Sequence, residues 1–520
     1  MNEKFSEVDL FFAETVLNKI TPYNQQEAFF LSYLFFISRK GFIGLHIDND
    51  VISPAVSLFG ITESNDLRIA AKNLLYSGIV ATCPEEESQK IICFENNTFY
   101  LQRNYLLKNK IMQALTSQPK EKQNDKFDEK IFFQELEKYS LSDEQKKTAI
   151  HSFSHHLTII CGGPGTGKTK TASAIAKMLT TSYLKEKIKI ILTAPTAKAS
   201  FHLKDKIENG EAITLHALLK MSRQKNLNKN KFIDADIIIV DEASMIDIKL
   251  MAFLFSSVLP TTKLILLGDE DQLFPVAPGE IFSFLADSSY AFTLREKFRF
   301  KNENLSLLAE ALKEEDKNKF FSCFSSDNKI SLMPFNESVF IKLVDQHFSQ
   351  FYSSLPDIAS LLQKRFTFAI LSCLRLGPLG ADDLNAKIIN YLLQKLPKNN
   401  YFFAPIIITK NDYDLSLYNG TMGFLLFYKD NNGTISQKEA YFEDGTNLKK
   451  IPLFTSYEYG YVLSVHKSQG SEFDECVVII PPGSETFGKK IIYTAISRAK
   501  EKLLLFASHE DLEKNYFTNN

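Results

Sequence analysis

A glycine-rich segment, CGGPGTGKTKTASAIAKML from Cys161 to Leu179, constrains the fold of this chain more than any other feature. It follows the short apolar run LTII and leads into a helical pattern. The spacing G-x-x-x-x-G-K-[ST] is typical of a loop whose backbone N–H groups wrap around a phosphate, which side chains in place of the glycines would obstruct. Because a strand precedes the loop and a helix follows it, we favour this interpretation over a plain glycine turn. The predicted phosphate-binding residues are Gly162, Gly163, Pro164, Gly165, Thr166, Gly167, Lys168 and Thr169.

Three segments carry side chains suited to the chemistry of a nucleoside triphosphate. In the loop, Lys168 would neutralise the β- and γ-phosphates, and the Thr169 hydroxyl would bind Mg²⁺. The apolar run IIIV ends in Asp241, which would hold Mg²⁺ through its water shell, and Glu242, which would orient or deprotonate the attacking water. Gln272, in LILLGDEDQ, would sense the γ-phosphate through its neutral amide. ATP and Mg²⁺ are therefore the predicted ligands. Taken alone, the segment with Asp241 could be a strand that ends in surface acids, and the segment with Gln272 could be a turn rich in Gly and Asp.

Buried strands alternate with helical patterns from about residue 140 onward. The strand-like runs cover 157–161, 188–194, 235–240 and 264–267, and their residues are almost all apolar. Near-continuous apolar strands separated by helices are typical of a parallel sheet that is covered by helices on both faces. The sequence therefore predicts an α/β fold.

The remainder of the chain divides by composition. The N-terminal part mixes apolar helical patterns with short strand-like runs, and a polar, lysine-rich stretch separates it from the α/β part. Turn signals at Asn431-Asn432-Gly433 and Asp444-Gly445 indicate short antiparallel strands. We expect a mainly helical N-terminal domain over 1–115, a linker over 116–138, an α/β domain over 139–300 with a hairpin insert at about 205–232, and a second α/β domain over 301–520 with a small β-barrel insert at about 400–456.

Composition restricts the function only weakly. The chain has 520 residues and a formal net charge of −2, so any contact with nucleic acid would have to come from a local channel of positive charge. Its six cysteines form no C-x-x-C pair, and neither an export signal nor a membrane-spanning run is visible, which together predict a cytoplasmic protein. Arginine is rare, with nine residues against fifty-one lysines, so each arginine is a candidate for a role that needs its planar guanidinium.

Read together in chain order, the motifs resemble those of the superfamily 1 DNA helicases, and in particular the RecD family, the alpha subunits of exodeoxyribonuclease V. The resemblance covers about 141–506 and implies two RecA-like domains in tandem with an SH3-like barrel inserted in the second. Beyond the phosphate loop it rests on LSDEQ (141–145), TAPTAKAS (193–200), TLHALLK (214–220), LREKFRF (294–300), LRLGPLGADDLN (374–385), GYVLSVHKSQGSEFDECVVIIP (460–481) and YTAISRAK (493–500).

The resemblance also implies roles for individual residues. Gln145 would read the adenine, Gln469 would join the nucleotide site, and Arg299 and Arg498 would be arginine fingers on the γ-phosphate, unless they are structural ion-pair partners. The DNA-binding candidates are Thr196, Lys198, His216, Ser464, His466 and Lys467. Among these, the threonine and serine could instead cap helices, and the histidines could be buried and hydrogen-bonded. Arg375 could equally contact DNA or pack at the surface.

The family's function supplies the expected activity and partners. The resemblance implies an ATP-dependent helicase that moves 5′ to 3′ on single-stranded DNA, acts at duplex ends, and forms a heterotrimer with beta and gamma subunits in double-strand break repair. One alternative is a free-standing RecD-like helicase, although the paired G-x-G hairpins of those longer proteins are not visible in the N-terminal region. Another is a non-catalytic scaffold. The presence of Lys168, Glu242 and both finger arginines argues against this alternative.

Overall fold

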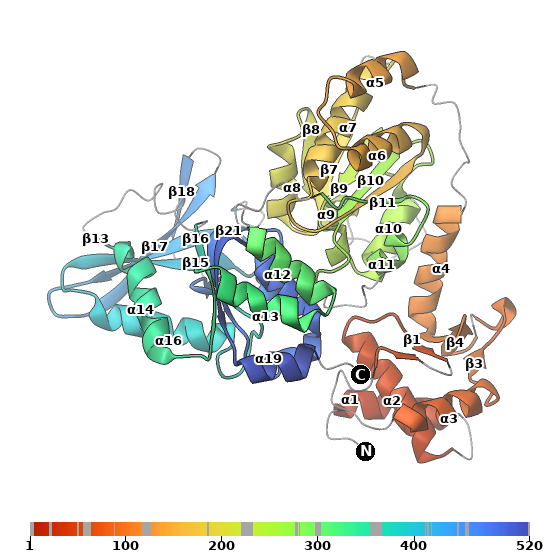
Figure 1. Ribbon diagram of the computed structural model, residues 1–520, viewed down its shortest axis with the longest axis horizontal. Coiled ribbons are helices and arrows are strands. Elements are labelled where there is room, and N and C mark those ends of the chain that lie inside the picture. Colours follow the sequence, from red (N-terminus) through yellow and green to blue (C-terminus); the bar gives the residue numbers. More distant parts are fainter. Residues whose placement is uncertain are drawn as a thin grey trace. The chain divides into compact units, whose positions relative to one another are not determined.

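In the computed structural model the chain forms two compact units (Figure 1). The first comprises Met1–Pro195, Ala199–Glu270 and Phe274–Glu296, and the second Thr196–Lys198, Asp271–Leu273 and Lys297–Asn520. The residues described are 5–517 except for 20–22, 49–50, 56–63, 88, 117–125, 185–186, 220–231, 276–278, 280, 297–302, 354–366, 411, 413–414, 416, 418, 445–446 and 453–456.

The N-terminal part of the first unit combines four helices with a small sheet. Its strands follow the order β2-β1-β5-β4-β3, so the short strand-like runs seen in the sequence belong to one sheet, which the expectation of a mainly helical domain did not include. The core between helices and sheet is rich in phenylalanine, because helix α2 is apolar on nearly every side. The elements are α1 (Glu7–Leu17), α2 (Gln25–Arg39), β1 (Gly44–Ile47), β2 (Ile52–Ser53), α3 (Ser64–Leu75), β3 (Val80–Ala81), β4 (Ile92–Glu95), β5 (Thr98–Leu101) and α4 (Gln102–Thr116).

The rest of the first unit is a parallel sheet of six strands in the order β11-β6-β10-β9-β7-β8. Its strands are β6 (Leu157–Cys161), β7 (Ile190–Ala194), β8 (Gly210–Thr214), β9 (Ile237–Val240), β10 (Lys263–Gly268) and β11 (Ala291–Thr293), and its helices are α5 (Glu129–Leu136), α6 (Asp143–Ser154), α7 (Lys168–Ser182), α8 (Ala197–Lys204), α9 (Leu215–Leu219), α10 (Ile248–Ser257) and α11 (Ile281–Ala286). The four strands expected from the sequence are therefore confirmed, and all are parallel.

Alternate residues of the central strands enter two separate cores. Ile238 and Val240 pack with helices α4, α10 and α11 on one face, whereas Ile237 and Ile239 pack with α5, α6 and α7 on the other. Helices thus cover both faces, which explains why these strands carry apolar residues at every position.

Two of the expected boundaries differ from the structure. Residues 129–136 of the expected linker form helix α5, whose Phe132 is fully buried in the core beneath the sheet. In the expected hairpin insert, residues 210–214 form β8, which pairs in parallel with β7. Helix α5 buries apolar side chains against the sheet, whereas β8, whose residues are partly buried or exposed, extends the sheet through its backbone pairing with β7. The Lys- and Asn-rich tip over 221–231 lies outside the described residues.

The second unit contains a parallel sheet in the order β12-β22-β21-β14-β20. Two cores again lie on its faces, since Ile370 and Leu371 of β14 enter different clusters. Its elements are α12 (Glu303–Lys313), α13 (Lys317–Ser326), β12 (Ile330–Met333), α14 (Glu337–Phe348), β14 (Phe368–Ser372), α16 (Ala381–Lys395), β20 (Val462–Ser464), α17 (Val465–Ser468), β21 (Phe473–Ile479), α18 (Lys489–Ile496), β22 (Ala499–Phe506) and α19 (His509–Tyr516).

An antiparallel sheet is formed mainly by strands between α16 and β20, the region in which the sequence predicts an insert, together with one short strand that precedes β14. It consists of β13 (Tyr352–Ser353), β15 (Asn400–Ile408), β16 (Met422–Lys429), β17 (Ile435–Asp444), β18 (Asn447–Pro452) and β19 (Tyr457–Tyr459). Both β13 and β19 pair with β15, and the rest follow in the order β15-β16-β17-β18. Among the described residues no pairing joins β18 to β13 or β19, so closure into an SH3-like barrel stays a prediction.

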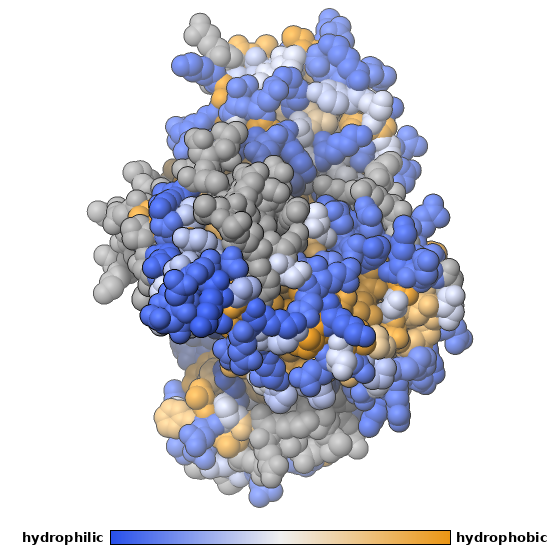
Figure 2. Space-filling view, turned by 90° about the vertical axis from the view of Figure 1, so that its left-hand side faces the viewer, coloured by the Kyte–Doolittle hydropathy of each residue, from blue (hydrophilic) through white to orange (hydrophobic). Residues whose placement is uncertain are grey.

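The surface mixes polar and apolar side chains. On the face shown in Figure 2, hydrophilic residues surround smaller apolar areas. None of the helices in the described part of the chain has both the length and the hydropathy needed to cross a bilayer.

A partly buried histidine and a buried lysine make the stability of the first unit sensitive to pH. Burial, together with the charge of Lys263, lowers the pKa of His156 to about 4. Burial also lowers the pKa of Lys263 to about 7, although its Nζ donates to the carbonyl oxygen of His155 at 3.0 Å. Between pH 6.5 and 4 the unfolded chain binds a proton at His156 that the folded chain does not, so stability falls as the pH falls through this range.

We therefore predict that His156→Gln reduces the acid sensitivity of the fold. The drop in apparent melting temperature between pH 7 and pH 5 should be smaller in this variant than in the wild type, whatever its melting temperature at pH 7. The control is His509→Gln, since the His509 side chain is 59% exposed on α19. Equal drops in the wild type and in His156→Gln would contradict the prediction.

Candidate functional site

The candidate site lies at the carboxyl edge of the first parallel sheet. Strand β10 pairs with β6 on one side and with β9 on the other, placing Cys161 opposite Gly268 and Val240 opposite Leu266. The Gly162 N–H donates to the carbonyl oxygen of Gly268 at 3.3 Å. The glycine-rich loop and the acidic segment after β9 therefore begin at the same edge, where ligands of such sheets bind.

Three glycines of the loop have positive φ angles: Gly162 (155°), Gly165 (79°) and Gly167 (86°). A Cβ atom at Gly162 would lie 2.8 Å from the carbonyl oxygen of Leu294 and 2.7 Å from Thr166 Oγ1. Any other residue would force the backbone of the loop apart. The loop is thus a cradle that depends on glycine, as a phosphate site requires.

Helix α7 begins at Lys168, directly after the loop. The Lys168 Nζ donates to the carbonyl oxygens of Gly162 at 2.6 Å and of Gly163 at 3.1 Å, so the ammonium group lies over the cradle. Thr169 follows in the first turn of the helix and is partly exposed. A phosphate in the cradle would meet both the ammonium charge and the positive end of α7.

Asp241 and Glu242 follow β9 at the same edge. Asp241 Oδ1 accepts a hydrogen bond of 2.8 Å from the backbone N–H of Glu242. Burial raises the pKa of Asp241, and the nearby Lys168 opposes this shift. Glu242 has φ 51° and ψ 40°, a left-handed conformation that costs a non-glycine residue about 1–2 kcal/mol. Such strain is common where a side chain must be held in a functional direction.

Gln145 lies in the first turn of α6. Its Oε1 accepts from the backbone N–H of Ser142 at 3.2 Å, as part of a capping box. Its Nε2 is buried and has no hydrogen-bond partner within the described ranges. Because buried amide groups are nearly always hydrogen-bonded, this nitrogen marks a place where a ligand would supply a hydrogen-bond acceptor.

Three of the expected nucleotide-site residues lie in the second unit. Gln272 is buried there, next to Leu273, whose N–H donates to Thr494 Oγ1 at 3.0 Å. The Nε2 of Gln469 donates to the Leu273 carbonyl oxygen at 3.4 Å. Arg498 is the third. Arg299 lies outside the described residues.

Arg498 is 3% exposed and follows Ser497, the C-cap residue of α18. Its guanidinium donates to the Thr494 carbonyl oxygen at 3.0 Å, to the Ser471 carbonyl oxygen at 3.2 Å and to Ser497 Oγ at 2.9 Å. No carboxylate of the described residues forms an ion pair with it. The alternative of a structural ion pair therefore has no support in this part of the chain, and a buried guanidinium without a carboxylate suits an anionic ligand.

The DNA-binding candidates occupy both units. Thr196 directly precedes α8, Lys198 lies in the first turn of that helix, and the exposed His216 lies on α9. Ser464 is the N-cap residue of α17, but its side chain makes no capping hydrogen bond. On the same short helix, burial lowers the pKa of His466, whose ring meets Phe487 edge-on at 5.3 Å.

Parts of the chain match two protein families and several known proteins. Residues 140–333 match the family described as AAA domain, and residues 459–506 match the UvrD-like helicase C-terminal domain. The RecBCD enzyme subunit RecD of Buchnera aphidicola (subspecies Acyrthosiphon pisum) is 28% identical over 72% of this chain and 74% of its own length, and several further RecD subunits match similarly. The chain is thus similar to RecD subunits over most of its length, and these matches support an ATP-hydrolysing DNA helicase.

Two further proteins match over a smaller share of their own length or at lower identity. The ATP-dependent RecD2 DNA helicase of Deinococcus radiodurans is 28% identical over 70% of this chain and 48% of its own length. Among solved structures, a Pif1 helicase from Bacteroides in complex with ADP-AlF3 and single-stranded DNA covers 74% of this chain and 95% of its own, with 17% identity and a TM-score of 0.41.

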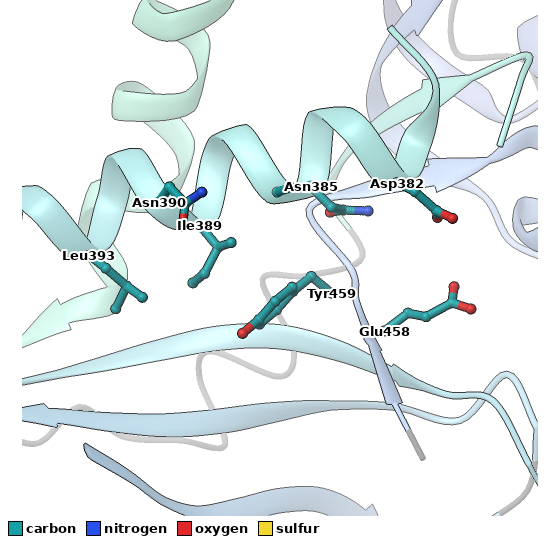
Figure 3. A pocket seen from close by; sticks show the side chains of 8 residues that line it. Asp382, Asn385, Ile389, Asn390, Leu393, Glu458 and Tyr459 are labelled. Atoms are coloured by element: carbon teal, nitrogen blue, oxygen red, sulfur yellow. The ribbon is translucent and has the colours of Figure 1, made fainter. Parts of the chain in front are cut away.

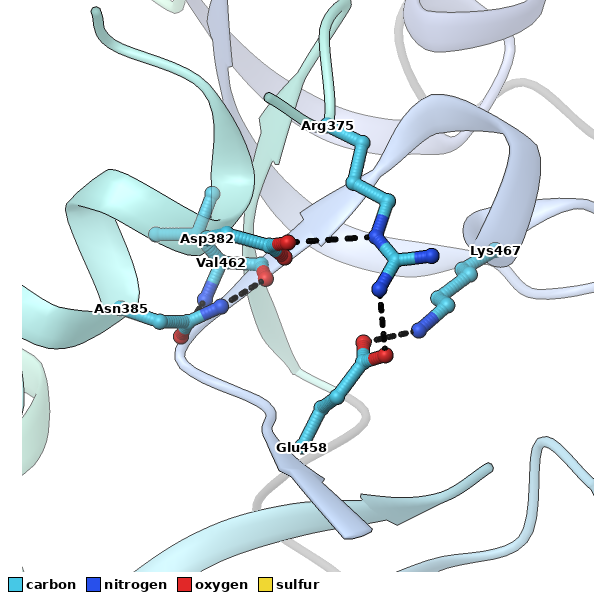
Figure 4. Close-up of polar contacts among 6 residues, drawn as sticks. All are labelled: Arg375, Asp382, Asn385, Glu458, Val462 and Lys467. Atoms are coloured by element: carbon cyan, nitrogen blue, oxygen red, sulfur yellow. Dashed lines mark hydrogen bonds and ion pairs between the residues drawn. The ribbon is translucent and has the colours of Figure 1, made fainter. Parts of the chain in front are cut away.

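A cluster of charged side chains that sequence reasoning did not foresee lies beside α17 (Figure 4). Arg375, in the loop after β14, donates to Glu458 of β19 at 2.9 Å and to Asp382 of α16 at 3.2 Å. Lys467 also donates to Glu458. Arg375 is thus a surface residue in ion pairs, and no feature of the sequence indicated Glu458 as its partner.

A pocket of about 390 Å³ opens next to this cluster, between α16 and β19 (Figure 3). Tyr459 forms its floor below Ile389, and Asp382 and Glu458 lie at one end. Glu458 also lines a smaller hollow shared with Arg375 and Lys467. The pocket and the charged cluster are therefore continuous.

Asn385 holds α16 to the strand that leads into α17. Its Nδ2 donates to the Val462 carbonyl oxygen at 2.8 Å, and its Oδ1 accepts from the Val462 N–H at 3.0 Å. Both residues are buried, so the asparagine side chain provides hydrogen-bond partners for backbone groups on the outer edge of β20, the last strand of its sheet. The segment LRLGPLGADDLN drew attention to this residue through the family resemblance, without indicating this role.

We predict that Asn385→Ala destabilises the second unit by about 3 kcal/mol, because it leaves two buried backbone groups of Val462 without partners. Urea unfolding of the full chain should show a lower midpoint for the transition of this unit. The matched control is Asn390→Ala, an exposed position of the same helix, which should shift the midpoint little. Equal midpoints for both variants would show that Asn385 contributes no stability.

Proposed function

We propose that this RecD-like helicase translocates on single-stranded DNA by hydrolysing ATP at the carboxyl edge of its first parallel sheet. The observation that carries the proposal is the convergence at this edge of the glycine cradle, Lys168 and the Asp241–Glu242 pair. Lys168 neutralises the β- and γ-phosphates, while Gln145 uses its buried amide nitrogen to bind the adenine.

Mg²⁺ fits the same edge, because a hydroxyl and a carboxylate are oxygen ligands of the kind it prefers. Thr169 would hold the ion directly, and Asp241 through water. When bound, the ion would neutralise charge that develops on the phosphates during hydrolysis. A bound cation would also favour the ionised form of the partly buried Asp241.

Hydrolysis needs a positioned water and positive charge on the γ-phosphate. Glu242 orients or deprotonates the water, and its strained backbone fixes the direction of the carboxylate. Arg498 and Arg299 act as the arginine fingers, with Gln272 as the sensor of the γ-phosphate and Gln469 as a further residue of the nucleotide site. For Arg498, the support is its burial without a carboxylate partner among the described residues.

The strand would pass along both units through contacts with phosphates and stacked bases. Thr196, Lys198 and His216 would contribute from α8 and α9, and Ser464, His466 and Lys467 from the short helix α17. Such contacts bind any sequence, because the backbone is the same for every base.

We further propose movement from 5′ to 3′ and a cytoplasmic role as the alpha subunit of a heterotrimeric helicase–nuclease that works at broken DNA ends. The support is that several similar proteins are named as RecBCD subunits. A free-standing helicase is the second candidate, supported by the similarity to the RecD2 helicase of Deinococcus radiodurans.

Lys168→Gln should abolish DNA-stimulated ATP hydrolysis, with a loss of at least about a hundredfold, because it removes the cation over the phosphate cradle. Phosphate release in the presence of oligodeoxythymidylate measures this. The matched control is Lys170→Gln, an exposed lysine of the same helical turn, which should keep most of the activity. Equal turnover in the wild type and Lys168→Gln would refute the site.

Direction and partnership are tested by unwinding and co-purification. The purified protein, alone and with beta and gamma subunits from the same source, should unwind duplexes with a 5′ single-stranded tail and not those with only a 3′ tail. A stable complex with both subunits supports the heterotrimer, whereas full unwinding without any complex supports the free-standing helicase. Preference for 3′ tails by the protein alone would contradict the proposed direction.

A further inference from the structure

The Glu458 carboxylate bridges two cations that come from distant parts of the chain. Arg375 lies in the loop after β14 and Lys467 on α17, and each donates to a different oxygen of Glu458 (Figure 4). Asp382 binds the Nε of the same arginine and keeps its guanidinium facing this position. The two cations thus hold one anionic group between them.

The backbone, rather than the ion pairs, brings the carboxylate to this place. Glu458 lies on β19, where it pairs opposite Ile407 of the long strand β15. Arg375 and Lys467 follow β14 and β20, which are neighbours in the parallel sheet. The cation pair therefore belongs to the α/β domain, while the anion between them is supplied by the inserted antiparallel sheet.

These ion pairs are too exposed to serve mainly as a structural bridge. The side chains of Arg375 and Glu458 are 55% and 29% exposed. Ion pairs open to solvent contribute about 0–1 kcal/mol each, because water and salt screen them. Another anion with two oxygens, such as a DNA phosphate, would replace the carboxylate at little cost and gain the same two charge-assisted contacts.

We propose that Arg375 and Lys467 form a phosphate site of the DNA track and that Glu458 is an internal competitor, which fills the site until a phosphate displaces it. The inference rests on the proposed function, in which the strand passes along α17. The pocket beside the cluster, which Glu458 also lines, gives its side chain space to turn away (Figure 3). An enzyme that moves along DNA must release each phosphate it binds. Because the Glu458 carboxylate can re-form its ion pairs with the two cations as the phosphate leaves, it lowers the barrier to release.

The test is Glu458→Gln, which keeps the shape of the side chain and removes its charge. Binding of a fluorescent oligodeoxythymidylate should tighten roughly two- to tenfold, the factor that corresponds to losing exposed ion pairs of this kind. The DNA concentration that gives half-maximal ATP hydrolysis should fall by a similar factor. The matched control is Glu439→Gln, a carboxylate of the same inserted sheet that pairs with Lys450, and it should leave DNA affinity unchanged.

A double-mutant cycle separates competition from a general change in surface charge. In the Arg375→Gln/Lys467→Gln background, adding Glu458→Gln should give no gain in affinity, since no cations are left to release. A gain of the same size in both backgrounds would overturn the proposal, as would unchanged or weaker binding by Glu458→Gln alone. If the wild-type protein fails to bind the oligonucleotide at all, the proposed function is refuted as well. If the wild-type protein binds but Glu458→Gln gains no affinity, only the role of Glu458 as a competitor is refuted.

Discussion

Strands that are buried on both faces leave room for polar side chains only at their ends, and this constraint organises both units. In β6, β9 and β10 every residue is buried, and alternate residues enter the cores on opposite faces of the sheet. Because the strands are parallel, their carboxyl ends meet at one edge. The glycine cradle, Lys168 and the Asp241–Glu242 pair gather there as a consequence of sheet register, although they lie about seventy residues apart in the sequence.

The same rule operates in the second unit with a different outcome. Ser372 at the end of β14 lies opposite Ser464 at the end of β20, so the loop carrying Arg375 and the helix carrying Lys467 leave the sheet side by side. Here the inserted sheet adds a layer over the edge and contributes Glu458. Two parallel sheets thus present polar groups at equivalent edges, one with a cradle for phosphates and the other with a pair of cations already in contact with a carboxylate.

Sequence patterns predicted the parts of the structure that local chemistry determines. The phosphate loop was recognisable because positive φ angles require glycine, and the central strands because burial on both faces requires apolar residues throughout. Helix α5 and strand β8 were missed, and the short strand-like runs of the N-terminal part gave no indication that they join in one sheet. In these segments polar residues surround short apolar stretches, so the apolar residues follow neither a clear helical nor a clear strand period. The contact of Glu458 with Arg375 and Lys467 could not be predicted, because it depends on the pairing of β19 with β15 across an insertion. Domain boundaries and the roles of the site residues stay predictions.

A net charge of −2 gives little indication that the chain binds a polyanion, and the surface explains why this quantity is a poor guide. Many lysines and arginines lie beside carboxylates, as Arg375 lies beside Glu458 and Asp382, so the charges cancel in the sum while the cations stay accessible to solvent. Because exposed ion pairs are weak, an incoming phosphate exchanges with a carboxylate instead of adding to an existing positive field. The affinity for DNA then depends on how easily individual carboxylates move aside, which is a local property of geometry and exposure that no total charge can express.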